Sequence, residues 1–293
     1  GAVGAVEAIL NTGFFETKVH LAEGFFRING VSPNSIVLAQ SCLFALPMAL
    51  YLARHGRNRL QHMAAVFCAA FLLAITARTF NFQNLIIAPV IVVAAAALFR
   101  GQLARRLLLG CTVAALLAVP FLFPIMNARL QRVHSGADES MRLRMDNAIN
   151  AMQVYKSHPW FGAGLGSFPD AWWPVRSMDT YINKYEEIPR QQEVDQNYFL
   201  LLAETGLIGF AANIIFYLAM IAFIWRARAK HRNDPPVADF AAVLLIIWVQ
   251  YLASGLTQDA IFHMRTWLLF GMSAALVNVV ACRVPSDKPA QFP

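Results

Sequence analysis

Seven long runs without Asp, Glu, Lys or Arg constrain the fold of this chain more than any other feature. Each run is about long enough for a helix to cross a hydrocarbon core of roughly 30 Å. Because 58% of the residues are hydrophobic and only 14% are charged, an ordinary soluble domain is excluded. The sequence therefore predicts an all-α, polytopic transmembrane helical bundle of about seven spans. The runs cover residues 35–53, 60–77, 79–99, 107–128, 205–225, 240–258 and 266–282.

Residues 1–293 are expected to form one membrane domain. The opening GAVGAVEAIL looks like the tail of an earlier apolar segment, which predicts the C-terminal part of a longer protein. The four cysteines lie in or at the edge of the predicted spans and form no CxxC motif. They indicate neither a disulfide nor a zinc site.

The short polar loops predict the orientation of the bundle. Residues 53–59 and 100–106 carry three Arg each, and residues 226–232 carry three Arg and one Lys, whereas 76–84 and 257–265 carry one Arg each. Cytoplasmic loops are enriched in Lys and Arg, so the first three are predicted to be cytoplasmic, and the alternation holds through all seven spans. The formal net charge of +7 then reflects topology and does not indicate binding to nucleic acid.

The longest polar segment, residues 129–196, is predicted to be an extracytoplasmic loop. It is too long for a simple connector, and its three Trp and three Tyr residues disfavour disorder. Apolar residues at helical spacing predict a helix over 142–159 that stops at Pro159, and FGAGLGSF then predicts a Gly-rich turn. The Trp172–Trp173 pair is typical of a membrane–water interface. We expect a small, partly helical cap.

Polar side chains are expected to converge at the outer mouth of the bundle. Charged groups at membrane depth are costly and persist where they pair or line a polar cavity. Arg forms fork-like contacts with phosphate oxygens, so a mouth with several Arg suits a lipid-linked phosphate. The converging residues are Arg27, Arg78, Arg144, Asp195, Gln196, Glu204, Asp259 and Arg265.

Simpler interpretations of these residues stay open. Asp195 could cap the helix that starts near Gln196, and Arg78 could anchor a helix end by snorkelling. Anchoring is the preferred interpretation of Arg27 and Arg265. Glu204 and the nearby Gly206 could orient an Arg and let helices pack closely, or Glu204 could form a structural ion pair. The GAGLGS run is interpreted as a tight turn, because it follows no strand of a βαβ unit.

Four segments in a fixed order carry a family resemblance: FRINGVSPNSIVLAQ (26–40), TARTF (76–80), RLRMDNAINAMQVYKSHPWFGAGLGSF (142–168) and VDQNYFLLLAETGLIGF (194–210). Together they resemble the O-antigen ligase and polymerase family of bacterial inner-membrane glycan transferases. The most specific part is HPWFGAGLGSF followed by QNYFLLLAETGLIG.

The resemblance implies that a glycan moves from undecaprenyl diphosphate, at the periplasmic face of the inner membrane, to an acceptor hydroxyl on a glycan, lipid core or protein. It implies inversion at the anomeric carbon, membrane lipid as a partner, and no nucleotide sugar, cofactor or metal. Arg78 and Arg144 match family arginines that would hold the diphosphate, where charge develops in the transition state. The candidate substrate-binding residues are Arg27, Arg142, Glu193, Asn197, Glu204 and Arg265.

The chain departs from the family's ligases at one position. Ligases typically carry His-Asn where this chain has Gln196 and Asn197, and that His is the proposed base. A glutamine cannot accept a proton from a hydroxyl at neutral pH. VDQNYF is more similar to polymerase-like members, which favours a polymerase with Asp195 or Glu193 as the base and leaves a ligase open.

Two other classes of function stay open. A transporter of the same lipid would predict charged residues near mid-span, which the uncharged runs lack. A catalytically degenerate membrane scaffold would be compatible with the missing His. We rank an enzyme first, then a scaffold, then a transporter.

Overall fold

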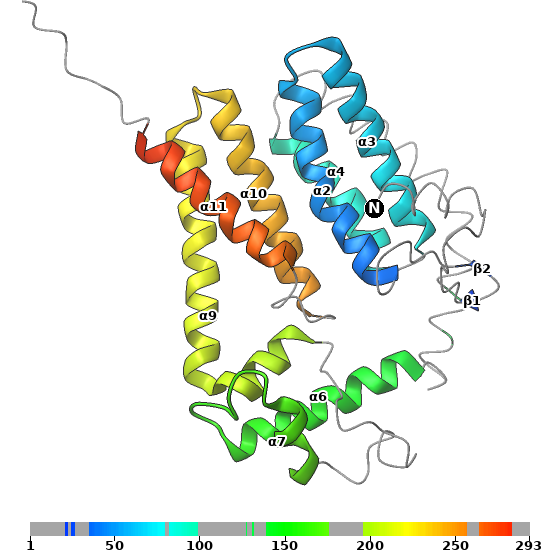
Figure 1. Cartoon of the computed structure of the whole chain (residues 1–293), viewed down its shortest axis with the longest axis vertical. Coiled ribbons are helices and arrows are strands. Elements are labelled where there is room, and N and C mark those ends of the chain that lie inside the picture. The colour runs from blue at the N-terminus through cyan, green and yellow to red at the C-terminus, as the bar shows by residue number, and fades with distance from the viewer. Residues whose placement is uncertain are drawn as a thin grey trace, which may run out of the picture.

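The computed structural model describes residues 21–22, 25–26, 35–79, 82–98, 139–175, 196–256 and 264–282, with the single positions 127 and 131. In this part of the chain, eight helices account for nearly all residues, and two strands of two residues each, β1 (Leu21–Ala22) and β2 (Phe25–Phe26), pair antiparallel. The predicted all-α class is confirmed (Figure 1). The helices are α2 (Ser35–His55), α3 (Arg59–Arg78), α4 (Phe82–Leu98), α6 (Glu139–Ser157), α7 (Phe168–Val175), α9 (Asn197–Lys230), α10 (Pro235–Ser254) and α11 (Met264–Cys282).

Six of the seven uncharged runs are helical, and the run at 107–128 lies outside the described residues apart from position 127. Helices α2, α3, α9 and α10 are long and apolar enough to cross a membrane, while α4 and α11 contain shorter apolar segments. Pro47 and Pro89 lie inside α2 and α4, as membrane helices allow where neighbours satisfy the freed carbonyls. A helical membrane bundle is therefore confirmed.

Helix α10 is the centre of the bundle. Every residue from Ala241 to Trp248 is buried, because α2, α4, α9 and α11 pack around α10, and α3 packs against α2 (Figure 1). The Trp248 indole N–H donates to the Ser273 hydroxyl of α11 at 3.1 Å. Lipid offers no partner for such a group, so it must be satisfied inside the bundle.

The two ends of the bundle differ in chemistry. At one end Asp239 Oδ2 lies 2.8 Å from both Arg54 Nε and His55 Nε2, beside the Arg-rich loops. The opposite end, where α2 begins and α10 ends, is the end at which α6 and α7 lie (bottom of Figure 1). It is also the end predicted to face outward. In the described helices of the bundle, the buried polar side chains at this end are amides and hydroxyls, namely Gln40, Thr76, Thr79, Asn84, Gln250, Ser254 and Thr266.

Helices α6, α7 and the first turns of α9 form a cap with its own apolar core. The helix predicted over 142–159 is confirmed as α6, and the predicted turn follows it, with positive φ at Gly162, Gly164 and Gly166. The prediction that the Trp172–Trp173 pair lies at the membrane–water interface stays a prediction, and Trp172 itself packs inside the cap core with only 1% of its surface exposed. Trp160 is exposed instead, at 62%. The core residues of the cap are Ala151, Val154, Phe168, Trp172, Leu200 and Ala203.

Helix α6 buries a partly polar face. Met145 and Ile149 are exposed, whereas Asn147 and Asn150 are buried. The two Asn share a helix face with Val154, which packs against α7 and α9 in the cap core. Helical periodicity therefore identified the helix, but not the side that faces the rest of the protein.

Candidate functional site

Backbone hydrogen bonds join two segments about forty residues apart, the loop after α6 and the part of α9 around Gly206. Gly206 interrupts α9 with φ 64° and ψ −169°, and α9 changes direction there (Figure 1). The backbone N–H and C=O groups that lose their partners within the helix at this break bond to the loop that follows α6. HPWFGAG and AETGLI therefore form one structural unit. The four bonds are Ala163 N to Ala203 O (3.0 Å), Gly164 N to Glu204 O (2.9 Å), Leu207 N to Pro159 O (2.8 Å) and Ile208 N to Trp160 O (3.2 Å).

Gly162 and Gly206 make this close approach possible. A Cβ added to Gly206 would lie 2.5 Å from Gly162 N and from the Trp160 carbonyl, and one added to Gly162 would lie 2.3 Å from the Glu204 carbonyl. The backbone conformation of Gly206 is also essentially restricted to glycine. The expectation that Gly206 lets two helices pack closely is wrong, because its close neighbour is a loop.

Glu204 connects α9 to α7 beneath this contact. It is 4% exposed, and its Oε1 accepts a hydrogen bond from Phe168 N at 3.3 Å. Phe168 is the first residue of α7, so this N–H has no partner within its own helix. The carboxylate therefore satisfies a backbone donor in the cap.

Glu204→Ala is expected to destabilise the protein by about 1–3 kcal/mol, because a buried N–H loses its acceptor. Glu204→Gln keeps an oxygen at the same position and is expected to cost clearly less. The melting temperatures of the purified variants in detergent test this ranking. Equal losses for the two substitutions would show that the negative charge, and not the acceptor, stabilises the cap.

The start of α9 contacts α6 directly. Gln196 occupies the N-cap position, but its side chain makes no capping bond, and its Nε2 donates to the Arg144 carbonyl at 3.0 Å. Gln196 is 8% exposed and Asn197 is 1% exposed. Arg144 Nε, Gln196 Oε1 and Asn197 Oδ1 are buried without a hydrogen-bond partner in the described part of the chain. Because buried polar groups are ordinarily paired, this contact is suited to bind a polar ligand.

The contact continues onto the end of α10. The Tyr198 hydroxyl donates to Leu252 O at 2.7 Å. Gly255, which follows α10, lies against Asn197 and Tyr198 at the start of α9. A Cβ added to Gly255 would lie 3.3 Å from the Tyr198 ring and 3.4 Å from Asn197 Cβ. The mouth of the bundle is therefore shared by α6, α9 and α10.

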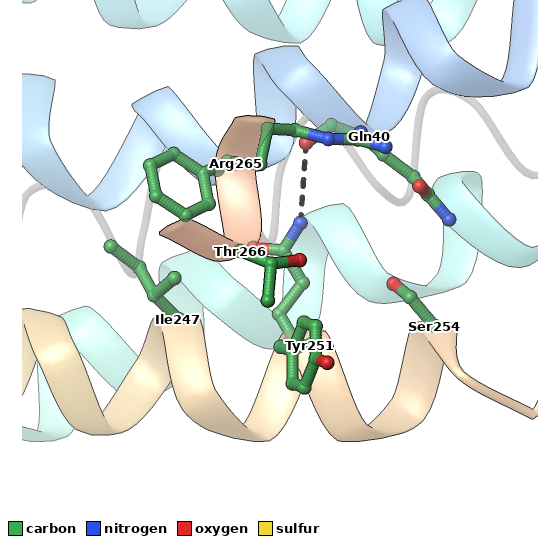
Figure 2. Close-up of a pocket in the computed structure, with 8 residues that line it drawn as sticks. Gln40, Ile247, Tyr251, Ser254, Arg265 and Thr266 are labelled. Carbon is green, nitrogen blue, oxygen red and sulfur yellow. Dashed lines mark hydrogen bonds between the residues drawn. The ribbon is translucent and has the colours of Figure 1, made fainter. Parts of the chain in front are cut away.

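A small cavity lies beside Ser254, between α2, α10 and α11, and both polar and apolar side chains line it (Figure 2). Gln250 Nε2 donates to Gln40 O at 3.4 Å, and Arg265 Nη1 donates to Val37 O at 3.2 Å. The cavity measures about 30 Å³, which has room for about two waters and not for a sugar.

The structure describes six of the eleven predicted side chains and brings three of them together. Arg144, Gln196 and Asn197 meet at the mouth. Arg142 is exposed on α6, Glu204 lies in the cap, and Arg265 lines the small cavity. Arg78 ends α3, but its side chain lies outside the described residues, as do Arg27, Glu193, Asp195 and Asp259.

Several buried amides at this end were not predicted. Gln40 and Gln250 lie within uncharged runs, and Asn150 lies on the buried face of α6. Counting only charged residues missed them, although an amide inside an apolar run is itself a signal, because hydrocarbon offers it no hydrogen bond.

Comparison with known proteins bears on the same segments. No curated protein matches the chain. The family model described as O-antigen ligase matches residues 63–214, which is more than half of the chain. The match includes both segments that the four backbone hydrogen bonds join, 158–164 and 203–208, and the contact between Arg144 and Gln196. The chain therefore belongs to the O-antigen ligase family, as an integral membrane protein with a role in glycan processing.

Proposed function

We propose that the protein transfers an undecaprenyl-diphosphate-linked glycan to an acceptor hydroxyl at the outer face of the bacterial inner membrane. The contact between Arg144 and Gln196 carries this proposal. It gathers an unpaired guanidinium nitrogen and two unpaired amide oxygens at the covered end of the bundle. A diphosphate offers oxygens to the cation, and sugar hydroxyls can donate to the amide oxygens.

The proposed reaction is an inverting displacement. The acceptor oxygen forms a bond to the anomeric carbon, and the bond from that carbon to the diphosphate oxygen breaks. The electron pair leaves with undecaprenyl diphosphate, and the hydroxyl proton passes to a base. Arg144 and Arg78 would stabilise the negative charge that grows on the leaving group.

Asp195 is the proposed base. Gln196 is excluded chemically, because a neutral amide cannot accept the proton, and its Nε2 is engaged with the Arg144 carbonyl. Gln196 therefore has a positioning role, in which it joins α9 to α6. In the sequence Asp195 immediately precedes Gln196, the N-cap residue of α9 that bonds to Arg144.

Within this reaction a polymerase is favoured over a ligase, because VDQNYF carries an acid before Gln196 and no His. A transporter is disfavoured, since the charged residues of the described spans lie near their ends and not at mid-span. The degenerate scaffold remains the alternative that activity measurements must exclude.

The proposal is tested with the complete gene in a host that lacks its own enzyme. Wild type, Arg78→Ala, Asp195→Asn and Gln196→His are compared at equal membrane abundance, with surface glycan read as a length ladder on a gel. Arg57→Ala, exposed at the opposite end of the bundle, is the control. We expect a ladder from wild type and Arg57→Ala only.

Two outcomes contradict this expectation. A normal ladder from Asp195→Asn would remove Asp195 as the base. Absence of any glycan change from wild type, together with transfer to lipid core by Gln196→His, would identify a ligase relative that has lost its base.

A further inference from the structure

The end of the bundle opposite the candidate site contains a larger, basic cavity. It measures about 380 Å³ and lies between the ends of α2, α9 and α10. Arg54, Arg228 and Arg232 line it together with a single carboxylate, Asp239. That carboxylate already accepts from Arg54 Nε and from His55 Nε2, each at 2.8 Å. The surplus of guanidinium groups favours an anion, above all one with phosphate oxygens.

An apolar groove of about 340 Å³ lies along two of these helices, α9 and α10, where they pack beside α4. Trp225 and Val249 in its wall are 57% and 58% exposed, so the groove opens toward the lipid that surrounds the bundle. A lining of this kind suits a hydrocarbon chain.

The groove and the basic cavity share one face of α9. Ile221, Trp225 and Arg228 follow one another at intervals of four and three residues, which places them on the same side of the helix. The Arg228 guanidinium carbon lies 5.9 Å from the centroid of the Trp225 ring. A wall residue of the groove therefore contacts a wall residue of the cavity.

We propose that this face binds an anionic phospholipid, with its phosphate in the cavity and one acyl chain in the groove. Arg228 and Arg232 would contact the phosphate, and Trp225 would lie where the headgroup meets the chain. An anionic lipid is favoured over a zwitterionic one, because a choline or ethanolamine cation would meet the guanidinium groups. The site lies at the opposite end of the bundle from the proposed transfer reaction and does not depend on that function.

Native mass spectrometry of the full-length protein in detergent tests this site, with phosphatidylglycerol and phosphatidylcholine of identical chains as probes. We expect saturable binding of phosphatidylglycerol to wild type. The double variant Arg228→Gln/Arg232→Gln should bind it about tenfold more weakly or worse, since each basic group near the surface contributes appreciably. Arg226→Gln/Lys230→Gln is the matched control. It removes the same charge at the same spacing from the same end of α9, but neither residue lines the cavity.

Equally weak phosphatidylglycerol binding by the two double variants would overturn the proposal, because it would show that the lipid is attracted to the basic surface in general and not to the cavity. No weakening in either would overturn it as well. Val249→Trp, which fills the groove, should also weaken binding, whereas Val279→Trp, 40% exposed on α11, should not. Effective competition by soluble glycerol 3-phosphate would assign the cavity to a free phosphate instead of a lipid.

Discussion

Gly206→Ala is expected to prevent accumulation of the folded protein or to lower its melting temperature by roughly 10 °C. The new Cβ would lie 2.5 Å from backbone atoms of Trp160 and Gly162. Neither residue can move away without breaking the backbone hydrogen bonds between this loop and α9 on either side of Gly206. The φ of 64° and ψ of −169° add conformational strain that a side chain cannot avoid. Together these effects cost about 3 kcal/mol or more. Membrane abundance and thermal unfolding in detergent measure the loss.

Two other glycines separate the two causes. Gly166 has φ 73° with no atom within 4 Å of an added Cβ, so Gly166→Ala should show strain alone, about 1–2 kcal/mol. Gly271 lies in α11 with open space around it, so Gly271→Ala should be close to neutral. If Gly206→Ala is no worse than Gly166→Ala, the contact between the loop and the helix break is not as close as described.

Arg144→Ala is expected to reduce glycan transfer about 100-fold, the usual loss when one fixed donor to a developing anion is removed. The protein should nevertheless fold normally. Gln196 bonds to the backbone carbonyl of Arg144 and not to its side chain, so truncation leaves the contact between α6 and α9 in place. Transfer rate with lipid-linked donor in membranes, measured beside the melting temperature of the purified protein, tests both statements.

Lys156→Ala is the control for Arg144→Ala, because Lys156 is exposed on the same helix and should tolerate the change. Arg144→Lys should fall between alanine and wild type, since lysine keeps the charge but cannot contact two phosphate oxygens as a fork. Normal transfer by Arg144→Ala would exclude Arg144 from the diphosphate site. A matching loss of stability would assign it a structural role.

Local sequence patterns predicted the helices of this protein well. Uncharged runs predicted all the described spans, and the pattern before Pro159 predicted α6. The pattern did not predict that Met145 would be exposed and Asn150 buried, because the buried side of α6 depends on the neighbour and not on the helix. The pattern also did not predict that Trp172 packs inside the cap core, because an aromatic pair is typical of a core as well as of an interface.

The candidate site was predictable only as a set of residues. The order of the motifs suggested that Arg144 and Gln196 act together, but not that an amide of one would bond to the carbonyl of the other. The helix break at Gly206 was also unexpected. The run at 205–225 read as the start of a span, whereas α9 begins at Asn197 and changes direction at Gly206.

The sequence by itself determined the class of fold and the approximate position of the spans that the structure describes. A hydrocarbon core tolerates neither unpaired backbone nor frequent charge, so long uncharged runs must become helices wherever they pack. Only the tertiary structure decided that the loop after α6 satisfies the backbone groups released at Gly206, and that α6, α9 and α10 share one mouth. Those contacts join residues far apart in the chain, and their free energy depends on which partner fills the space beside each group.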